Sequence, residues 1–466
     1  KGGGWPILTP HDTPAFEHVA DAYPMPSVGL GLPAVSDGLY HGYEDVDVVE
    51  SELYAKYDVK RGLRNADGSG VLVGLTTISN VHGYNRTDHG IEPDGGRLIY
   101  RGYGVDQLIG AAQAEDRFGY EEVAYLLIAG KLPTRAELDD FRARVDARKQ
   151  LPEGYLGLFP RATYSHSIMN VLQRATLLLY AFDPNPDDTS PTHEIDVALS
   201  LLGRWPRTAA VAHAAHVAEQ NDERLLVPPV REGYSMAETV LDVLRSDEGF
   251  THEEAMLLDV MLILHAEHGG GNNSTFTTRV LSSSGTDAYS AYAAAIGSLK
   301  AGDMIDDVAA HVRDWSDDDE VAGYLGKILR KEAFDHAGLL YGLGHAVYTK
   351  TDPRAEIIRE YARRLAEQKG QVDKLDLIAS IERLGPQVMR DVRGITKPIS
   401  TNIDMYTGFV YSMLGIPQDL FTPIFAMARL AGWTAHRMEE LYGAGRIIRP
   451  AYNSVMPNGG EYVPLD

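Results

Sequence analysis

The sequence predicts a mainly α-helical globular protein with a few short strands near its N-terminus. After Gly104 the apolar residues recur with a period near 3.6 in one segment after another, which is the spacing of helices. Only two stretches, both before that point, are expected to form strands. The 466 residues, 44% hydrophobic and 23% charged, fit two or three ordinary domains, or one large domain with a smaller one attached, and exclude disorder.

The expected elements begin with an extended arm, because residues 1–50 carry Pro and Gly turn signals with little periodicity. Strands are expected at residues 70–81, which alternate loosely, and at 97–100, with the turn-rich segment 88–96 between them. A first helix ends at Gly130. Further helices are expected at residues 135–148, 167–180, 193–220, 236–245, 252–268, 289–300, 319–332, 354–367, 373–384, 409–414 and 423–442.

Charge and composition exclude several kinds of protein. The 66 acidic and 43 basic residues give a net charge of −23, which repels nucleic acid and anionic lipid. The longest nearly apolar stretch, residues 255–264, has about half of the roughly 20 residues that a membrane span needs. There is no Cys, and no apolar signal-peptide core follows Lys1, so we expect a cytoplasmic protein. An anionic small molecule would need a local cluster of arginines.

Two histidines, His265 and His268, lie at the end of the most apolar helix, followed by a Gly-rich segment up to Phe276. A helix that is apolar on most sides is buried, so these polar groups reach the interior or a cleft. Each can also be an ordinary core histidine with satisfied hydrogen bonds. A zinc site is weakly indicated, because the spacing is His-x-x-His and no third ligand is near.

A second cluster, residues 342–354, reads Gly-Leu-Gly-His-Ala-Val-Tyr-Thr-Lys-Thr-Asp-Pro-Arg. The two glycines allow close approach of a ligand to the backbone beside His345, and Arg354 can offer a planar fork to a carboxylate. A third cluster places Asp404 at a loop-to-helix junction, where an aspartate is usually an N-cap. Arg429 and Arg449, in a fourth cluster, would normally be surface charges.

Taken together, these motifs resemble the citrate synthase family, and specifically its citrate and 2-methylcitrate synthases. The resemblance runs from about Tyr57 to Val455. It implies a citrate synthase-like two-domain helical fold, with an arm at 1–50, a large domain at 51–304 and 415–466, and a small domain at 305–414. It also implies a homodimer in which each chain completes the other's site.

The resemblance also implies roles for single residues. His345 matches the histidine that polarises the oxaloacetate ketone and protonates the alkoxide, and Asp404 matches the base that deprotonates the acetyl methyl group. The matching oxaloacetate-binding residues are His268, Arg354, Arg429 and, from the partner chain, Arg449. Plausible coenzyme A contacts are Leu343, Gly344, Ala346, Val347 and Lys350, although Lys350 can also be a solvated surface residue. Acetyl-CoA is implied as a co-substrate, with no permanent cofactor and no metal.

One part of the family pattern is missing. The family places a third histidine, the donor to the enolate, in a Gly-Pro-x-His-Gly-Gly-Ala-Asn-like segment directly after the helix that here ends near Lys300. This sequence continues Ala-Gly-Asp-Met-Ile, about a dozen residues shorter. Either the printed sequence omits a loop that the protein contains, or the deletion is genuine and the protein binds ligands without condensing them. We prefer the first explanation because every other site residue is present.

The sequence therefore predicts the reaction acetyl-CoA + oxaloacetate + water → citrate + CoA. A 2-methylcitrate synthase using propionyl-CoA differs by about one methylene in the acyl pocket, worth only about 1–3 kcal/mol, so composition cannot separate the two. Two other hypotheses remain: an inactive homologue that binds oxaloacetate or CoA, and a metal hydrolase using His265, His268 and Asp404.

Overall fold

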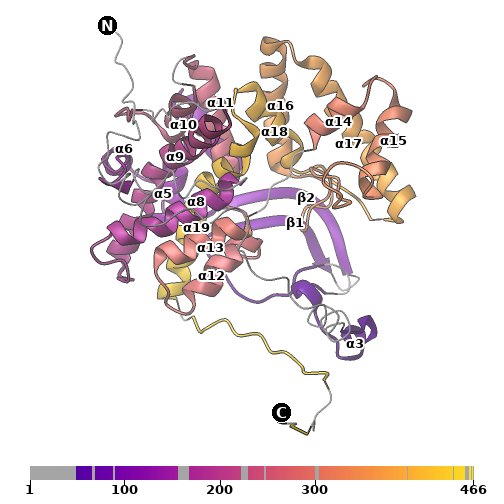
Figure 1. The fold of residues 1–466 in the computed structure, drawn as a ribbon, viewed down its shortest axis with the longest axis horizontal. Helices are drawn as coiled ribbons and strands as arrows, with labels where there is room; N and C mark the ends of the chain where they lie inside the picture. Colours follow the sequence, from indigo (N-terminus) through magenta and orange to yellow (C-terminus); the bar gives the residue numbers. More distant parts are fainter. Residues whose placement is uncertain are drawn as a thin grey trace.

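Helices make up most of the computed structural model, with one three-stranded sheet among them (Figure 1). The structure describes residues 49–65, 69–87, 90–155, 167–221, 229–245, 248–299, 304–395, 397–443, 445–456, 461–462 and 464. The mainly α fold predicted from the sequence is confirmed. Almost all of the expected arm at 1–50, and the shortened segment at 300–303, lie outside the described residues.

The helices form two groups. The first group contains α4 (Val105–Ala114), α5 (Tyr120–Ala129), α6 (Arg135–Asp146), α8 (Ile168–Leu179), α9 (Pro191–Asn221), α10 (Met236–Leu244), α11 (His252–His265), α12 (Asn273–Ser282), α13 (Ala288–Ser298) and α19 (Phe421–Tyr442). The short helix α3 (Ser51–Lys56) lies apart from it, at the lower right of Figure 1. The second group, at the upper right of Figure 1, contains α14 (Ile305–His311), α15 (Asp318–Leu329), α16 (Pro353–Lys369), α17 (Val372–Arg393) and α18 (Asp404–Met413). Single 3-10 turns lie at Arg61–Leu63, Tyr180–Phe182 and Gln418–Leu420. The division into domains at 304/305 and 414/415 stays a prediction.

Several helices begin where local capping chemistry places them. Helices α6, α10 and α11 each start after a Ser or Thr whose hydroxyl accepts a hydrogen bond from the backbone N–H three residues on, and the Glu at that position bonds back. This reciprocal pair satisfies two backbone donors that a helix start leaves open. At the other end, α5 stops at Gly130, whose φ of 79° is in the left-handed region, as the sequence predicts.

The sheet differs from the sequence prediction. Its order is β1 (Ser79–Thr87), β2 (Gly90–Tyr100) and β3 (Tyr103–Gly104), all antiparallel. The strand expected at 70–81 is wrong over most of its length, because residues 71–78 are irregular and Leu72 and Leu75 are more than 80% exposed. The turn expected at 88–96 is also wrong from Gly90 onward. Pairing in a long hairpin overrides the weak strand propensity of Gly and Asp, whereas β-branched residues without a partner strand form none.

Helix boundaries near the candidate site also differ. The helix expected at 409–414 begins five residues earlier, at Asp404, and the helix expected at 373–384 continues through Pro386 to Arg393. Helix α12 was not expected, because the Gly-rich run before it resembles a loop. Proline removes only one hydrogen bond from a helix interior, so packing of the neighbouring turns outweighs the loss in α17.

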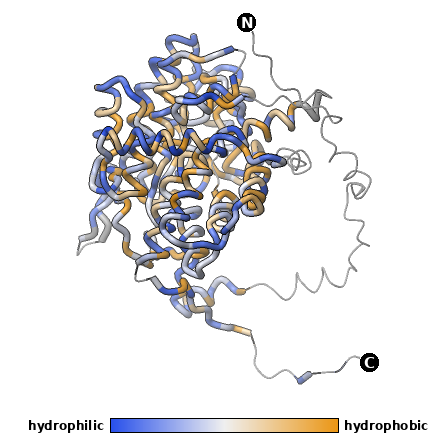
Figure 2. The backbone as a smooth tube through the Cα atoms, turned by 90° about the vertical axis from the view of Figure 1, so that its left-hand side faces the viewer, coloured by the Kyte–Doolittle hydropathy of each residue, from blue (hydrophilic) through white to orange (hydrophobic). Residues whose placement is uncertain are grey.

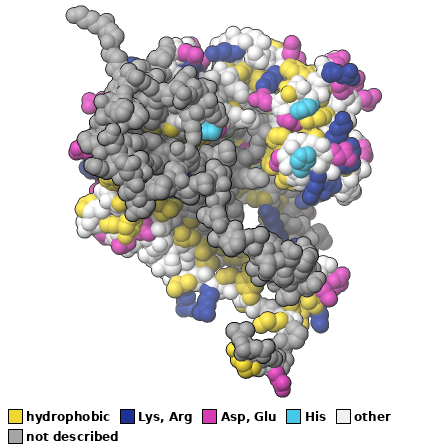
Figure 3. Space-filling view, viewed as in Figure 1, with side chains coloured by type: hydrophobic (Ala, Val, Ile, Leu, Met, Phe, Trp, Pro, Cys, Tyr) yellow, Lys and Arg dark blue, Asp and Glu magenta, His cyan; other side chains and the backbone are white. Residues whose placement is uncertain are grey.

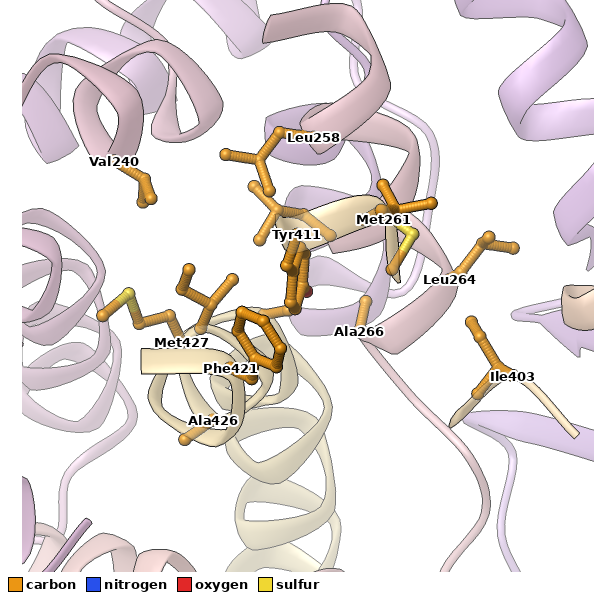
Figure 4. Packing of buried hydrophobic residues seen from close by; sticks show 14 of the residues in the cluster. Val240, Leu258, Met261, Leu264, Ala266, Ile403, Tyr411, Phe421, Ala426 and Met427 are labelled. Carbon is orange, nitrogen blue, oxygen red and sulfur yellow. The ribbon is translucent and has the colours of Figure 1, made fainter. Parts of the chain in front are cut away.

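The core lies where α11, α18 and α19 meet. Figure 4 shows Leu258 and Met261 of α11 close to Tyr411 of α18 and Phe421 of α19. All four side chains are at most 7% exposed. Burial of one such side chain is worth about 1.5–3 kcal/mol, so this contact fixes the ends of the three helices relative to one another.

The hydropathy of the chain follows this arrangement. Figure 2 shows hydrophobic segments mostly inside the body and hydrophilic segments mostly outside, and Figure 3 shows acidic and basic side chains mixed over the second helix group. In the described part of the chain, no helix is long and apolar enough to cross a bilayer. The expected cytoplasmic location stays a prediction.

Candidate active site

Two motifs far apart in the sequence are joined by backbone pairing. Leu343 and Thr401 form an isolated antiparallel bridge, and the backbone N–H of Asn402 donates to the carbonyl of Gly342 at 2.9 Å. The side-chain amide of Asn402 donates to the carbonyl of Gly344 at 2.8 Å. These bonds hold the loop that carries the predicted acid against the start of α18, which carries the predicted base.

The glycines of this loop are needed for its path. Gly342 and Gly344 have φ values of 85° and 86°, in the region that side chains disfavour. A Cβ on Gly342 would lie 2.8 Å from the Cα of Met405, the residue after Asp404. The Gly-x-Gly pattern noted in the sequence therefore allows the two motifs to approach, in addition to any contact with a ligand.

His345 is held in one orientation and one tautomer. Its Nδ1 accepts hydrogen bonds from the backbone N–H groups of Val347 and Tyr348, both at 3.0 Å. An accepting Nδ1 carries no hydrogen, so the hydrogen of the neutral ring is on Nε2. Burial, assisted by the positive charge of Arg354, lowers the pKa of His345 to about 4. At neutral pH the ring is thus an uncharged donor through Nε2.

His268 and Tyr348 pack against this ring. The His268 ring meets His345 edge-on at 4.9 Å between centroids, and Tyr348 stacks on His345 at 4.5 Å. Burial, together with the charge of Arg354, lowers the pKa of His268 well below its usual value. The Nε2 of His268 is buried and has no hydrogen-bond partner within the described residues. A buried polar atom of this kind is costly unless a ligand or water pairs with it.

Arg429 presents two open donors to the same region. Its side chain, on α19, is fully buried; its Nε donates to the carbonyl of His265 at 2.6 Å, and its guanidinium lies over the ring of Phe425. Both end nitrogens, Nη1 and Nη2, are buried without a partner in the part of the chain that is described. Burial lowers its pKa to about 10, which still leaves it charged at neutral pH. A carboxylate would match this fork.

Arg354 is engaged differently from the expectation. Its Nε and Nη2 bind the two carboxylate oxygens of Asp352 at 3.0 and 2.8 Å, so most of its fork is occupied within the chain. Asp352 is also the N-cap of α16 and accepts the backbone N–H of Arg354. Burial opposes the charge of Arg354, but Asp352 more than offsets it and raises the pKa above the ordinary value. Only Nη1 takes no part in this pair.

Five of the six predicted catalytic and substrate-binding residues come together. Asp404 is close enough to Arg354 and Arg429 for its charge to raise the pKa of both, and Arg354 lowers the pKa of His268 and His345. The result is a half-buried carboxylate beside two cations and two neutral imidazoles. Such a set can bind an anionic carbonyl compound and move a proton to or from it.

The sixth residue, Arg449, is not part of this cluster in one chain. It is exposed in the segment after α19, next to Ile448, whose N–H donates to Ser283 at the end of α12. This segment runs away from the body of the molecule in an extended conformation without secondary structure (Figure 1). The described structure of one chain therefore does not bring Arg449 to the other five residues.

The residues predicted to contact coenzyme A lie in the loop that carries His345, on both sides of that residue. Ala346 and Lys350 are exposed, and Gly344 and Val347 are half-buried. Leu343 is buried, and its side chain packs so tightly on Gly385 of α17 that a Cβ there would lie 2.1 Å from Cδ1 of Leu343. The side chain of Leu343 is thus occupied by packing on α17.

The hairpin β1–β2 supports the other side of this loop. The hydroxyl of Thr349 donates to the carbonyl of Gly83 at 3.0 Å, and the N–H of Gly96 donates to the hydroxyl of Thr351 at 3.1 Å. A Cβ on Gly96 would lie 2.1 Å from the carbonyl oxygen of Thr351. The hairpin thus touches the loop by direct backbone approach.

Three residues at the site were given no role from the sequence. Tyr348 stacks on His345, Asp352 pairs with Arg354, and Glu267 lies buried beside His268. The Asp-Pro order before Arg354 signals a helix N-cap and was available in the sequence. Glu267 stands beside the two histidines at the end of an apolar helix, which predicts a polar group in the interior or a cleft, but no local pattern assigns a role to it or to Tyr348.

A metal site finds no support in the contacts. Among the described residues, no group of three or more His, Asp or Glu side chains is arranged to hold a metal ion. His265 lies against the ring of Phe425 at 4.3 Å, and both of its nitrogens are buried. The metal-hydrolase hypothesis therefore has no ligand set in the part of the chain that we describe.

Comparison with known proteins identifies the family. The family model "Citrate synthase, C-terminal domain" matches residues 66–451. The chain is 32% identical to 2-methylcitrate synthase 1 of Corynebacterium glutamicum, covering 87% of this chain and 98% of that protein. It is also 32% identical to a citrate synthase of Haloferax volcanii, covering 88% and 99%.

Solved structures agree with the sequence comparison. A citrate synthase of Thermoplasma acidophilum, in a ternary complex with carboxymethyl coenzyme A and oxaloacetate, aligns with a TM-score of 0.68 at 25% identity over 87% of this chain and 98% of that one. A citrate synthase of Pyrobaculum aerophilum aligns with a TM-score of 0.66 at 27% identity over 85% and 93%. The chain belongs to the citrate synthase family.

Proposed function

We propose that the protein condenses acetyl-CoA with oxaloacetate and water to give citrate and CoA, and is thus an acyltransferase. The observation that carries the proposal is the convergence of Asp404 and the Nε2–H of His345 on a region where Arg429 has two donors without a partner among the described residues. Similar proteins named citrate synthase and 2-methylcitrate synthase share the same 32% identity with this chain. Propionyl-CoA is therefore the alternative acyl donor.

Oxaloacetate fits the charges of the site. In this proposal Arg429 binds one carboxylate through Nη1 and Nη2, and Nη1 of Arg354 contributes to the other. The Nε2 of His268 pairs with the substrate as well. Because the protein carries a net charge of −23, a dianion is attracted only where such a local cluster outweighs the overall field.

The chemistry then follows from the two proton-carrying groups. Asp404 removes a proton from the methyl group of acetyl-CoA, and the enolate carbon attacks the ketone of oxaloacetate. His345 polarises that ketone through Nε2–H and gives the proton to the new alkoxide. Hydrolysis of the thioester by water releases citrate and CoA. The low pKa of His345 keeps it in the neutral, donating form across the physiological range.

We also propose a homodimer. Arg449 is exposed far from the rest of the site, and the segment around it exposes Ile447, Tyr452 and Met456 by 66 to 95%. Apolar side chains of this kind on an extended segment are typical of a chain that packs on a partner. A partner that receives this segment would gain Arg449 as a further carboxylate ligand.

A binding protein without activity is the second candidate function, and the absence of the histidine segment after the helix ending at Ser298 favours it. Deprotonation next to a thioester is slow unless a donor meets the enolate oxygen, and loss of one such donor typically costs about 100- to 1,000-fold in rate. An intact mass of the purified chain above 51.1 kDa would reveal an omitted segment. A mass equal to it, together with oxaloacetate binding but no citrate formation, would support the inactive homologue.

Asp404→Asn tests the proposed function. The change keeps the shape of the side chain and removes the base, so citrate formation should fall by about 100- to 10,000-fold while calorimetry shows oxaloacetate binding unchanged within about threefold. Asp391→Asn, at an exposed position on α17, is the matched control and should behave as the wild type. Near-normal turnover in Asp404→Asn would reject the assigned base.

A further inference from the structure

Glu267 is a buried carboxylate that the proposed chemistry does not use. It directly precedes His268, is fully buried, and one of its oxygens, Oε1, has three partners. These are the N–H of Gly269 at 2.5 Å, the hydroxyl of Ser79 at 2.8 Å and Nε2 of His436 at 2.9 Å. Burial of a carboxylate costs free energy unless the group is paired and hydrogen-bonded. We therefore asked what this side chain contributes to the site.

The partners of Glu267 are themselves fixed. Nδ1 of His436 lies 3.0 Å from Nε and 2.7 Å from Nη2 of Arg279. A guanidinium can only donate, so Nδ1 accepts and the ring hydrogen is on Nε2, directed at Glu267. Arg279 is in turn bound by Glu439 and Glu440 at the outer end of α19. The chain of contacts thus runs from the site to the surface.

The same carboxylate fixes the turn that carries His268. Gly269, bonded to Glu267, has a φ of 85°, and the hydroxyl of Tyr100 lies 3.0 Å from the carbonyl of Glu267. The N–H of Gly432 donates to the carbonyl of Ala266, and a Cβ at Gly432 would lie 2.3 Å from Oε2 of Glu267. Elements β1 and α19 therefore meet at this side chain, and β2 bonds the backbone of the same residue.

Glu267 also acts on Arg429 without a hydrogen bond between them. Arg354 has a bound carboxylate in Asp352, whereas both end nitrogens of Arg429 are unpartnered in the described structure. The charge of Glu267 is nevertheless the first contribution that raises the pKa of Arg429 against the effect of burial. A negative charge that is near Arg429 but not hydrogen-bonded to it favours the protonated guanidinium and leaves Nη1 and Nη2 available to a ligand.

We propose that Glu267 is a positioning residue for oxaloacetate, which holds the turn of His268 and serves as the remote counter-ion that leaves both end nitrogens of Arg429 free for a substrate carboxylate. This inference rests on the proposed function. It explains why a negative group lies behind an anion site: without Glu267, burial would disfavour the charge on Arg429, and with a direct ion pair the fork would be occupied.

The test compares Glu267→Gln with the wild type by calorimetry with oxaloacetate and by steady-state kinetics. The variant keeps the shape and removes the charge, so the Kd and KM for oxaloacetate should rise about 10- to 100-fold, with kcat within about threefold and the KM for acetyl-CoA unchanged. Ser79→Ala, which removes one donor and leaves the charge, should raise the Kd about threefold and guards against a misfolded Gln variant. Glu440→Gln, at the outer end of the same chain of contacts, is the matched control and should leave the Kd unchanged.

A pH series separates this role from a merely structural one. The groups around Arg429 are Tyr100 on β2, His265 on α11, Glu267 and His268 after it, Arg354 on α16 and Asp404 on α18. Removing the negative charge of Glu267 lowers the pKa of Arg429, so oxaloacetate binding should weaken at a lower alkaline pH in Glu267→Gln than in the wild type. In Ser79→Ala, oxaloacetate binding should weaken at the same alkaline pH as in the wild type, so the alkaline limb of the binding profile should not shift.

The outcomes are distinct. A wild-type chain that does not bind oxaloacetate overturns the proposed function, and this inference with it. A wild type that binds, with an unchanged Kd in Glu267→Gln, overturns the positioning role alone. An equal loss in Glu440→Gln, or an unshifted alkaline limb in Glu267→Gln, also overturns it.

Discussion

The two arginines of the site illustrate how one residue type serves two purposes. Nε and Nη2 of Arg354 bind Asp352, at the N-cap of its own helix. The hydrogen bond of Arg429 within the described residues goes to a backbone carbonyl. From the sequence both matched carboxylate-binding positions equally. The difference lies in a local partner, since Asp352 is two residues from Arg354 and no acidic residue is near Arg429 in the sequence.

Arg429→Lys should weaken oxaloacetate binding, because an ammonium keeps the charge and loses the fork. We expect the Kd to rise at least about tenfold, as measured by calorimetry. Arg383→Lys, at an exposed pair with Asp318, is the control and should leave the Kd unchanged. An unchanged Kd in Arg429→Lys would remove Arg429 from the carboxylate site.

His265→Gln should change how stability depends on pH. Burial lowers the pKa of His265 well below 6.5, so the unfolded chain binds a proton below pH 6.5 that the folded chain does not. Stability from this group is present above pH 6.5 and is lost as the pH falls. Between pH 7 and pH 5, the free energy of unfolding of the wild type should fall relative to that of the variant by about 2 kcal/mol in urea titrations. Parallel pH profiles would mean that His265 keeps its ordinary pKa in the folded protein.

At the scale of elements, the hairpin and the His345 loop form one unit. The β1–β2 hairpin approaches residues 347–351 through glycines, and the loop in turn pairs with the start of α18. No local pattern in the sequence indicates these contacts, because they join segments more than 250 residues apart. The start of α18 at Asp404 likewise depends on the partner loop, since Asn402 binds Gly344 on one side and the N–H of Asp404 on the other.

Gly96→Ala tests this unit against the adjacent Gly95→Ala. The added Cβ at position 96 would lie 2.1 Å from the carbonyl oxygen of Thr351, whereas at position 95 it meets nothing within 4 Å. We expect Gly96→Ala to lower kcat/KM about 10-fold or more by displacing the His345 loop, and Gly95→Ala to stay within about twofold. Equal activities in the two variants would show that the hairpin does not position the loop.

At the scale of the whole molecule, the sequence predicted the fold class and most helices because each carries its own period and caps. Residues 135, 236 and 252 begin helices as expected, since a Ser or Thr with Glu three residues on is a local signal. The strand prediction was wrong for residues 71–78 because strand formation depends on a partner strand, which the local sequence does not identify. Tyr348 and Glu267 were missed for the same reason, because their importance lies in contacts with distant elements.

Complementation between two inactive variants tests the proposed dimer. Arg449 on one chain and Asp404 on the other are proposed to serve one site, so Arg449→Ala and Asp404→Asn should each be nearly inactive alone. Co-expressed chains form about one half mixed dimers, each with one complete site, which predicts about a quarter of wild-type activity in citrate formation. Activity no greater than the sum of the two separate variants would place Arg449 outside the site.

The backbone bridge between Leu343 and Thr401 has a further consequence for the timing of catalysis. His345, Arg354 and Asp404 all belong to the second helix group and are linked by this bridge and by α16, whereas His268 and Arg429 belong to the first. A movement of one group relative to the other would carry the proposed proton donor, His345, and the proposed base, Asp404, as one unit. The distance that such a movement changes is the one from this unit to His268 and Arg429, so the proposed acid and base are already together before oxaloacetate binds.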